Sequence, residues 1–432
     1  MRVLVVGGGA REHALLWALR RDCPDGTFFC LPGNAGTAKL ATNIPGSATD
    51  TDAVATVARE KRVDLVVVGP EAPLAAGLVD RLAKDGIPAF GPTAAAARIE
   101  SSKAFAKQLM LDAGVPTPGS RTFTDLDECE RYIISHPEPL VVKASGLAAG
   151  KGAVVCATRA EARAAAAEML QGSMGAAGQE VLIEEFILGE ELSVLAITDG
   201  EHFAVLPPAQ DHKRIGEGDT GPNTGGMGAY CPVSIATEDL LITVAREVFS
   251  PILKAMAKLG SPYRGVLYAG LMLPEHGGKP QVIEFNSRFG DPEAQAILAA
   301  TPPGLLPVLR MVAEGGWIPS GLRLGAAKCA AVTTVLAAEG YPNQPRSGAE
   351  IRIPHGLETA TDVHVFHAGT TMDGNGKLRV SGGRVLSVTA VGKDVAAAAA
   401  RSREAAEAVS FEGKQFRRDI GWREIERHAR AT

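Results

Sequence analysis

Three polar side chains at two-residue spacing, Glu284, Asn286 and Arg288, form the pattern in this chain that most clearly indicates chemistry. In a β-strand successive side chains point to opposite faces, so these three would share one face. The opposite face would carry Ile283, Phe285 and Phe289. Carboxylate and amide oxygens suit Mg²⁺, which usually links carboxylates to nucleotide phosphates, and a guanidinium can clamp an oxyanion. The pattern predicts a metal and phosphate site, with an ordinary solvated strand face as the alternative.

A glycine-rich segment follows the apolar strand that ends at Lys143. Glycine lets a backbone wrap closely around an anion. The segment is not a P-loop, because Gly152 follows Lys151 where a P-loop has Ser or Thr for Mg²⁺. We expect a flexible hairpin over nucleotide phosphates, and a plain glycine-rich turn is the alternative. The residues concerned are Lys143, Gly146, Gly150, Lys151 and Gly152.

Two further segments have features of binding sites. The pattern of residues 181–193 predicts two strands joined by an acidic turn. An apolar slot there would suit adenine, and a carboxylate would suit the ribose hydroxyls. The alternative is a turn whose acidic side chains are only solvated. Residues 211–228 are too polar and glycine-rich to build a core, and long ordered loops usually have a function. Lys213 and Arg214 could contact anions there, while Asn223, Thr224 and the next amides could hold a carboxylate. A disordered insertion is the alternative.

Near the N-terminus, Gly7–Gly9 follows a strand and opens a helix, so its amides could hold a phosphate. A dinucleotide-binding fold is the rival interpretation, but Glu12 stands where its fingerprint has the third glycine. No acidic residue ends a second strand at the right distance either. NAD binding is therefore disfavoured, while another phosphate-bearing ligand and a purely structural turn stay open.

Composition narrows the class of protein. A chain of 432 residues exceeds one ordinary core, and 46% apolar residues with 22% charged residues are typical of a globular protein. The net charge of −5 argues against a nucleic-acid surface. Six cysteines without a Cys-x-x-Cys pair favour reduced thiols. The chain enters a strand at once and has no apolar run of about 18 residues, so we expect a soluble cytoplasmic protein without a membrane partner.

The elements that must position these residues fall into successive regions. Residues 1–92 alternate strands with helices, including expected helices at Thr51–Lys61 and Leu74–Lys84, which predicts a parallel sheet covered on both faces. Ligands of such sheets bind beyond the carboxyl ends of the strands. The breaker cluster Gly114–Gly119 suits a domain boundary. From Ala326 the chain becomes β-rich and resembles a small separate module. Its expected strands are Ala330–Leu336, Glu350–Ile353, Val363–Phe366 and Lys377–Val380.

With these segments in order, the chain from residue 5 to residue 421 resembles the phosphoribosylamine–glycine ligases of the ATP-grasp superfamily. Residues 211–228 and 282–293 carry the resemblance most specifically. The other contributing segments are Gly7–His13, Ser102–Phe105, Lys143–Gly152, Glu184–Glu191 and Arg417–Gly421. The resemblance implies a multi-domain α/β protein with a doubly wound parallel sheet (residues 1–120), a central ATP-grasp fold of two α+β subdomains (121–190 and 191–325) and a small β-rich C-terminal domain (326–432).

The implied reaction has two steps. ATP phosphorylates the glycine carboxylate to glycyl phosphate, and the amine of 5-phosphoribosylamine then attacks to give glycinamide ribonucleotide, ADP and phosphate. Phosphorylation supplies the leaving group that a carboxylate lacks, and phosphoryl transfer asks mainly for positioning and charge neutralisation. The implied partners are these small molecules, with no nucleic acid or membrane, in a monomer or weak dimer.

The resemblance also implies roles for individual residues. It assigns Mg²⁺ or Mn²⁺ to Glu284 and Asn286, and catalytic roles to Arg288, Asp211 and Lys143. The implied ATP-binding residues are Lys103, Lys143, Gly146, Gly150, Lys151, Gly152, Glu184, Glu185, Phe186, Ile187 and Glu191. The implied substrate-binding residues are Gly8, Gly9, Asn34, Glu71, Asp211, Lys213, Asn223, Thr224, Gly225, Gly226 and Arg288.

Three other functions compete with this one. Another ATP-grasp enzyme, such as a purine-pathway carboxylase or formyl transferase, is disfavoured by the Asn-Thr-Gly-Gly-Met-Gly end of the 211–228 loop. A non-catalytic nucleotide-binding protein is disfavoured by the intact Lys143, Glu284, Asn286 and Arg288. An NAD-dependent oxidoreductase is disfavoured by Glu12.

Overall fold

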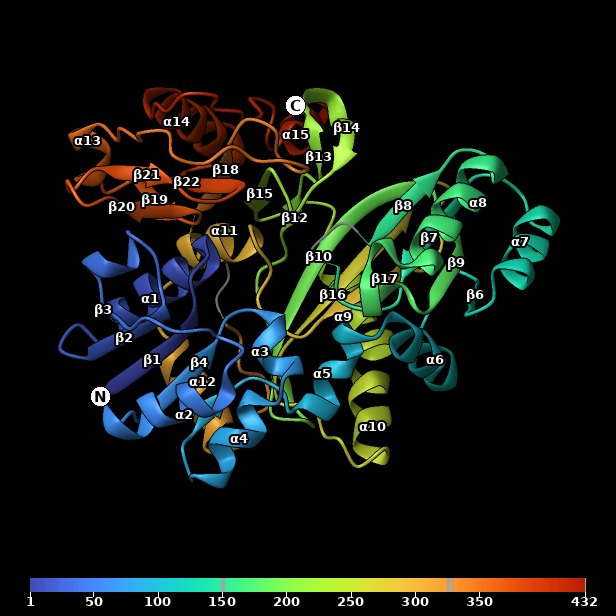
Figure 1. Ribbon diagram of the computed structural model, residues 1–432, viewed down its shortest axis with the longest axis horizontal. Helices are drawn as coiled ribbons and strands as arrows, with labels where there is room; N and C mark the ends of the chain where they lie inside the picture. Colours follow the sequence, from blue (N-terminus) through green and yellow to red (C-terminus); the bar gives the residue numbers. More distant parts are fainter. Residues whose placement is uncertain (149–151, 325–326, 328, 432) are drawn as a thin grey trace.

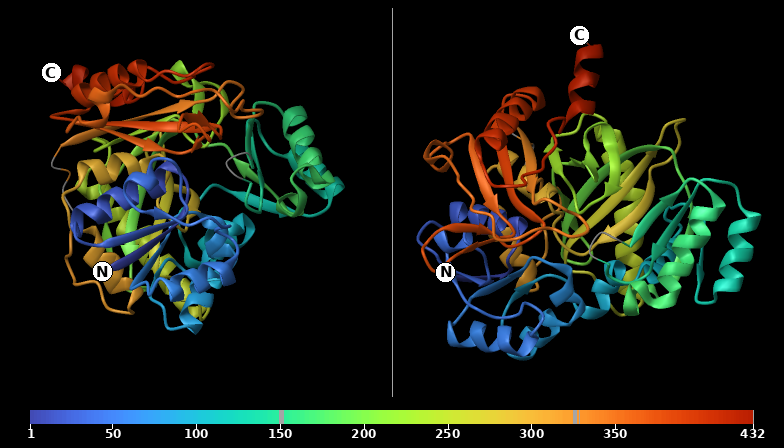
Figure 2. Two further views of the ribbon diagram at one scale, coloured as in Figure 1. Left: turned by 60° about the vertical axis from the view of Figure 1, so that its left-hand side comes forward. Right: turned by 45° about the horizontal axis from the view of Figure 1, so that its top comes forward.

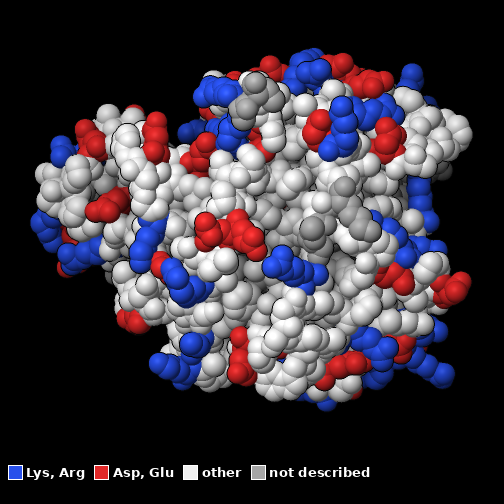
Figure 3. Space-filling model, turned by 180° about the vertical axis from the view of Figure 1, so that it is seen from behind, with Lys and Arg blue, Asp and Glu red and all other residues white. Residues whose placement is uncertain are grey.

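The computed structural model describes residues 1–148, 152–324, 327 and 329–431. Figure 1 shows an N-terminal region and a small region of teal strands and helices on opposite sides of the central strands, with the β-rich C-terminal region above. We call the teal region, residues 120–185, the lid. Figure 2 shows that the lid projects from the rest of the molecule in two further views. On the face drawn in Figure 3, acidic and basic side chains are intermixed.

The N-terminal sheet is parallel and has the strand order β3-β2-β1-β4-β5. Its two faces pack against different cores, because Val3 and Val5 belong to one apolar cluster while Leu4 and Val6 belong to another. The expected doubly wound sheet is thus confirmed. The expected helix Leu74–Lys84 is wrong in detail, since Gly77, with φ of 82°, separates two short helices. The elements are β1 (Arg2–Gly7), α1 (Ala10–Asp22), β2 (Thr27–Pro32), β3 (Thr42–Asn43), α2 (Thr51–Glu60), β4 (Leu65–Val68), α3 (Glu71–Ala75), α4 (Leu78–Lys84) and β5 (Ala89–Phe90).

Two helices lead into the lid, which is an antiparallel sheet of order β6-β9-β7-β8 covered by α7 and α8. The side chain of Ser102 accepts a hydrogen bond from the Phe105 amide and so caps α6. The glycine-rich segment joins β7 to β8. The elements are α5 (Ala94–Ser101), α6 (Lys103–Ala113), β6 (Ser120–Phe123), α7 (Leu126–Ser135), β7 (Leu140–Ala144), β8 (Ala153–Cys156), α8 (Arg159–Glu168) and β9 (Val181–Glu185).

The central sheet has the order β11-β10-β16-β17, and its long strands β10 and β16 pair over their full length. Strand β17 carries a bulge, because Gly270 pairs with Glu284 and the next residue, Leu271, pairs with Val282. The expected strict alternation is therefore wrong at Ile283, which lines the cavity described below, whereas Val282 is buried. The elements are β10 (Gly189–Thr198), β11 (Phe203–Val205), α9 (Glu238–Val244), α10 (Ser250–Lys258), β16 (Gly265–Pro274), β17 (Gln281–Asn286), α11 (Glu293–Ala300) and α12 (Leu305–Ala313).

The C-terminal strands share their sheet with the central region, in the order β12-β15-β18-β22-β19. Both β12 and β15 come from residues 210–231, so the expected separate module is wrong in this respect. The expected strand Glu350–Ile353 forms only isolated bridges to Arg379 and Ser410. The elements are β12 (Gln210–Asp211), β13 (Arg214–Gly216), β14 (Thr220–Asn223), β15 (Gly228–Cys231), β18 (Ala330–Ala337), α13 (His355–Glu358), β19 (Val363–His367), β20 (Thr370–Met372), β21 (Leu378–Val380), β22 (Arg384–Gly392), α14 (Val395–Ala408) and α15 (Trp422–Ala431). Short 3-10 or π turns are η1 (Thr37–Lys39), η2 (Met169–Ser173), η3 (Gly175–Gly178), η4 (Glu217–Asp219) and η5 (Ala245–Phe249).

Among the described residues, no single helix has both the length and the apolar composition to cross a membrane. The pair α11 and α12 passes that test together, but the two helices are bent by 118° relative to each other.

The junction between β15 and β18 is tight. A Cβ at Gly228 would lie 2.5 Å from the backbone oxygen of Thr333. We expect Gly228→Ala to lower the free energy of unfolding by about 1–3 kcal/mol, because the strands must separate to admit the methyl group. Urea unfolding measures the change. Gly356→Ala is the control, since its Cβ would meet no described atom within 4 Å; equal stability of the two variants would contradict the close packing.

Candidate active site

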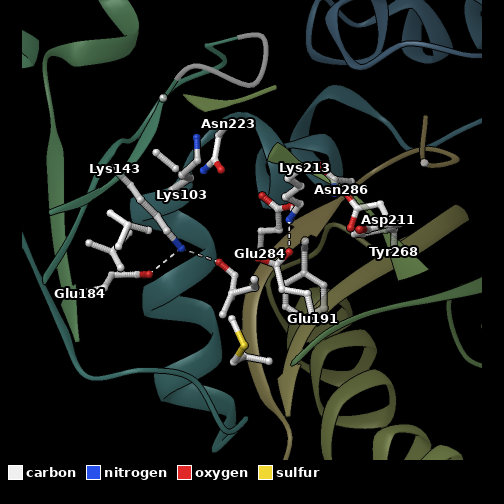
Figure 4. A pocket seen from close by; sticks show the side chains of 18 of the residues that line it. Lys103, Lys143, Glu184, Glu191, Asp211, Lys213, Asn223, Tyr268, Glu284 and Asn286 are labelled. Atoms are coloured by element: carbon white, nitrogen blue, oxygen red, sulfur yellow. Dashed lines mark hydrogen bonds and ion pairs between the residues drawn. The ribbon is translucent and has the colours of Figure 1, made fainter. Parts of the chain in front are cut away.

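A cavity of about 540 Å³ lies between the lid, the central sheet and the 211–228 segment. This volume is in the range of pockets that bind small molecules and cofactors. Strand β17 forms one wall with Ile283, Glu284 and Asn286, and β7 brings Lys143 from the lid. Figure 4 shows Lys143, Glu284 and Asn286 in the cavity together with Lys103 and Lys213, which come from other elements. The cavity therefore brings together the two segments in which the sequence predicted phosphate and metal chemistry.

Glu284 is surrounded by cationic side chains. Lys213 Nζ lies 3.5 Å from its Oε1. Burial would raise the pKa of Glu284, but Lys213, Lys143, Lys103 and Arg288 outweigh burial and lower the pKa to about 2. The carboxylate is thus ionised at neutral pH and available as an anionic ligand.

Glu284 and Asn286 offer two oxygen donors to one cavity. No group of three or more His, Cys, Asp or Glu that could hold a metal occurs within the described part of the chain. A divalent cation at these two residues would need phosphate or water oxygens to complete its shell. Mg²⁺ is usually bound in this way, by one or two protein oxygens together with substrate phosphates. The donor set therefore fits the predicted cation.

Arg288 lies just beyond β17 between two carboxylates. Its Nε is 3.0 Å from Glu71 Oε2, and its Nη2 is 2.9 Å from Glu100 Oε1. Burial lowers the pKa of Arg288, but the neighbouring carboxylates, Glu100 and Glu71 first among them, together raise it by more. The pKa of Arg288 therefore lies above its ordinary value. Glu100 also accepts hydrogen bonds from the Ser287 amide and hydroxyl. Arg288 is therefore held in the cavity wall by both carboxylates.

Glu184, on strand β9 of the lid, lies between Lys143 of the lid and Lys107 of α6. Lys143 Nζ is 2.6 Å from Glu184 Oε2, Lys107 Nζ is 2.8 Å from Glu184 Oε1, and Lys143 also donates to the backbone oxygen of Ile283. Burial raises the pKa of Glu184, while Lys143 and Lys107 together lower it below its ordinary value. Lys103 donates to the backbone oxygens of Ala144, at the end of β7, and of Gly146, just beyond it. Sequence reasoning missed Lys107, although its position four residues after Lys103 places both on one face of α6.

A second charge cluster lies on the opposite side of the cavity. Lys213 Nζ is 2.6 Å from Glu191 Oε2, so Lys213 connects Glu191 to Glu284. Burial is the largest influence on Asp211 and raises its pKa. Lys213 lowers the pKa, but the carboxylates Glu293, Glu191 and Glu284 raise it again, so the pKa lies well above its ordinary value. Sequence reasoning also missed Tyr268, whose hydroxyl donates to Glu293.

The 211–228 segment forms a hairpin of β13 and β14 followed by a tight connection to β15. The Gly225 amide donates to the Tyr341 hydroxyl, and the Gly226 amide donates to Thr224 Oγ1. The amides that were expected to hold a substrate carboxylate therefore have partners within the protein. Asn223 and Thr224 line the cavity.

The structure brings most, but not all, of the predicted residues to this cavity. Gly9 lies near its edge, since a Cβ on Gly9 would be 3.7 Å from Asp291 Oδ2. Asn34 donates to the backbone of Gly8 and His367. Gly150 and Lys151 lie outside the described residues. The predicted residues in the lining are Glu71, Lys103, Lys143, Gly152, Glu184, Glu185, Phe186, Ile187, Glu191, Asp211, Lys213, Asn223, Thr224, Gly225, Glu284, Asn286 and Arg288; those outside it are Gly8, Gly9, Asn34, Gly146 and Gly226.

Family models of phosphoribosylglycinamide synthetase match three stretches of the chain: the N domain matches residues 1–100, the ATP-grasp (A) domain residues 101–294 and the C domain residues 331–423. The phosphoribosylamine–glycine ligase of Rhodopirellula baltica is 46% identical over 97% of this chain and 96% of that protein. The human trifunctional purine biosynthetic protein adenosine-3 is also 46% identical, over 98% of this chain and 42% of that protein.

A solved structure points to the same family as these sequence comparisons. The crystal structure of phosphoribosylamine–glycine ligase from Thermotoga maritima has a TM-score of 0.85 and 34% identity, covering 97% of this chain and all of that one. A biotin carboxylase from Campylobacter jejuni, solved as a β,γ-ATP complex, has a TM-score of 0.74 at 17% identity, covering 98% of this chain and 95% of that one. The second likeness shows the fold alone.

The depressed pKa of Glu284 makes a prediction about acid stability. A carboxyl group whose folded pKa lies below its ordinary 4.5 stabilises the protein above that value and loses this effect as the pH falls toward about 2. We expect Glu284→Gln to be less stable than wild type at pH 7, with the difference shrinking below pH 4.5. Urea unfolding at several pH values measures it, and Glu275→Gln, an exposed position, is the control. A pH-independent difference would contradict the ion pairing.

Proposed function

This chain belongs to the phosphoribosylglycinamide synthetase family, and we propose on that premise that it catalyses the ATP-dependent ligation of glycine to 5-phosphoribosylamine in purine biosynthesis. The products are glycinamide ribonucleotide, ADP and phosphate. The observation that carries the proposal is the convergence of Glu284 and Asn286 with Lys103, Lys143 and Lys213 on one cavity. Oxygen ligands for a cation beside several ammonium groups suit a nucleotide triphosphate.

The first step transfers the γ-phosphoryl group. A glycine carboxylate oxygen forms a bond to the γ-phosphorus, and the bond from that phosphorus to the β-bridging oxygen breaks and releases ADP. Lys103 and Lys143 would neutralise phosphate charge, and Glu284 with Asn286 would hold Mg²⁺ or Mn²⁺, which supplies further charge neutralisation when bound. The chain's own contribution is mainly positioning and electrostatics.

The second step forms the amide bond. The amine of 5-phosphoribosylamine attacks the carbonyl carbon of glycyl phosphate, phosphate leaves with the electron pair of the broken C–O bond, and the amine loses a proton. Arg288, held by Glu71 and Glu100, is suited to the developing charge on the acyl phosphate. Asp211, Asn223, Thr224 and Gly225, which line the cavity, would face glycine. Glu71 in the lining would face 5-phosphoribosylamine, and Gly8, Gly9 and Asn34, outside the lining, would extend that subsite.

Two further assignments accompany this function. The division into residues 1–120, 121–190, 191–325 and 326–432 is supported by separate sheets in the first three parts, although the fourth shares its sheet with β12 and β15. A cytoplasmic location is supported by the free cysteines in the described chain, since disulfides are rare in reducing compartments.

The direct test is ADP formation from ATP with Mg²⁺, glycine and freshly made 5-phosphoribosylamine, with each substrate omitted in turn. We expect full turnover only when all three substrates are present, because the amine must remove the acyl phosphate. ADP release that is unaffected by omitting glycine, or that requires bicarbonate in its place, would contradict the assignment and favour the carboxylase alternative.

Glu284 is the residue whose replacement tests the cation site. We expect Glu284→Gln to reduce the rate of ADP formation by about a hundredfold or more, because one electrostatic contact to the transition state is removed. Steady-state rates at several Mg²⁺ concentrations measure this loss. Glu275→Gln should retain full activity, and near-normal turnover of Glu284→Gln at ordinary Mg²⁺ would remove this residue from the cation site.

A further inference from the structure

The C-terminal helix α15 contacts two parts of the cavity wall that lie far apart in the sequence. Figure 1 places α15 beside the β13–β14 hairpin. Its residues Arg423 and Arg427 are four positions apart, which puts both side chains on one face of the helix. Arg423 pairs with Asp219 of the hairpin, and Arg427 Nη1 lies 2.7 Å from Glu190 Oε2 at the start of β10. One helix face therefore touches both the hairpin and the strand that follows the acidic turn.

The contact to β10 extends into the buried wall of the cavity. Arg427 Nη2 lies 3.1 Å from the Tyr230 hydroxyl and 3.5 Å from Gln210 Oε1. Gln210 is 1% exposed, and its Nε2 donates to the backbone oxygen of Glu191 at 2.6 Å. Gln210 directly precedes Asp211 in the chain, and it bonds the backbone of Glu191, the residue after Glu190. A displacement of Arg427 would therefore also displace the start of β10.

The contact to the hairpin is reinforced from the segment just before α15. Arg417 is 1% exposed, and its Nη1 donates to Asp219 Oδ1 at 2.8 Å and to the Arg214 backbone oxygen at 3.1 Å. Asp419 accepts a hydrogen bond from the Gly218 amide at 2.8 Å. The Gly421 amide donates to His212 Nε2 at 3.0 Å. The hairpin and the preceding His212 are thus held by residues that lie about two hundred positions away in the sequence.

We propose that α15 is a positioning element of the active site, in which Arg427 holds the nucleotide-binding start of β10 and Arg423, supported by Arg417, holds the substrate-binding hairpin. The naming of these two subsites rests on the proposed function. Arg427 acts through the residues it holds, whereas Arg423 also lines the cavity itself beside its partner Asp219; Glu190, the partner of Arg427, is a lining residue as well. The side chains of these pairs are partly exposed, with Glu190 at 41% and Asp219 at 23%, so their role here is to hold the two carboxylates in place and not to stabilise the fold.

The experiment compares Arg427→Gln and Arg423→Gln in the full-length enzyme. Affinity for a non-hydrolysable ATP analogue with Mg²⁺ is measured by calorimetry, and the KM for glycine by ADP formation. We expect Arg427→Gln to weaken analogue binding about fivefold or more while the glycine KM stays unchanged. We expect Arg423→Gln to raise the glycine KM about fivefold or more while analogue binding stays unchanged. Arg427→Lys should recover part of the binding, because an ammonium still reaches Glu190 but lacks the fork that also meets Gln210 and Tyr230.

Arg430→Gln is the matched control on the same helix. The Arg430 side chain is 81% exposed and pairs with Glu426 at 3.1 Å, so both constants should stay at wild-type values. Variants that change both constants in the same proportion, or neither, would overturn the proposal. Thermal unfolding of each variant shows whether it folds, and Arg423→Lys replaces Arg423→Gln if that variant does not. The calorimetric arm does not depend on turnover, so failure of the proposed ligation and failure of this inference remain distinguishable.

Discussion

The structure of the cavity depends on compensation between buried ammonium groups and carboxylates. Glu184 neutralises Lys143 and Lys107 on the lid side, while Glu191 and Glu284 share Lys213 on the other side. For the Glu184 pairs, which are almost fully buried, removing one partner leaves an uncompensated charge and costs about 3–5 kcal/mol; the partly exposed Lys213 pairs contribute less. Nucleotide phosphates entering the cavity would compete with these carboxylates for the same lysines. The lysines that these carboxylates neutralise are therefore the cations that a triphosphate requires.

This arrangement needs three sheets to meet at one point. The bond from Lys143 to the backbone of Ile283 joins the lid to β17, and the β-bulge at Ile283 turns this residue toward the cavity. Strands β12 and β15 carry the polar segment into the C-terminal sheet, where β18 pairs with β15. Arg384 of β22 donates to the backbone oxygens of Gly225 and Asp291. The C-terminal region consequently supports the cavity wall, because Arg384 holds Gly225 and Asp291, which are lining residues.

The sequence predicts features that depend on local spacing. The strands β1, β4 and β17 and the convergence of Glu284 with Asn286 follow from apolar runs and from two-residue alternation, and the family and its fold are confirmed. Features that depend on pairing between distant segments were not predictable. A bulge is defined by the partner strand β16, and the membership of β15 in the C-terminal sheet is decided by its pairing with β18. The roles of Lys107 and Tyr268 depend on the buried carboxylates that they meet.

Glu12 explains why the N-terminal glycine-rich turn resembles a dinucleotide fingerprint without completing it. Its carboxylate accepts a hydrogen bond from the Gly9 amide at 2.6 Å and pairs with Arg11 at 2.6 Å. A Cβ at Gly7 or Gly69 would come within 2.5 Å of the Glu12 side chain, so these two glycines leave room for a carboxylate of the protein itself. An anion already sits against the first turn of α1, where a dinucleotide pyrophosphate would otherwise bind. A phosphate placed there would be repelled by the Glu12 carboxylate, and Arg11 would offset this repulsion only in part. The site therefore favours a ligand that contacts this edge of the sheet through hydroxyl or amine groups.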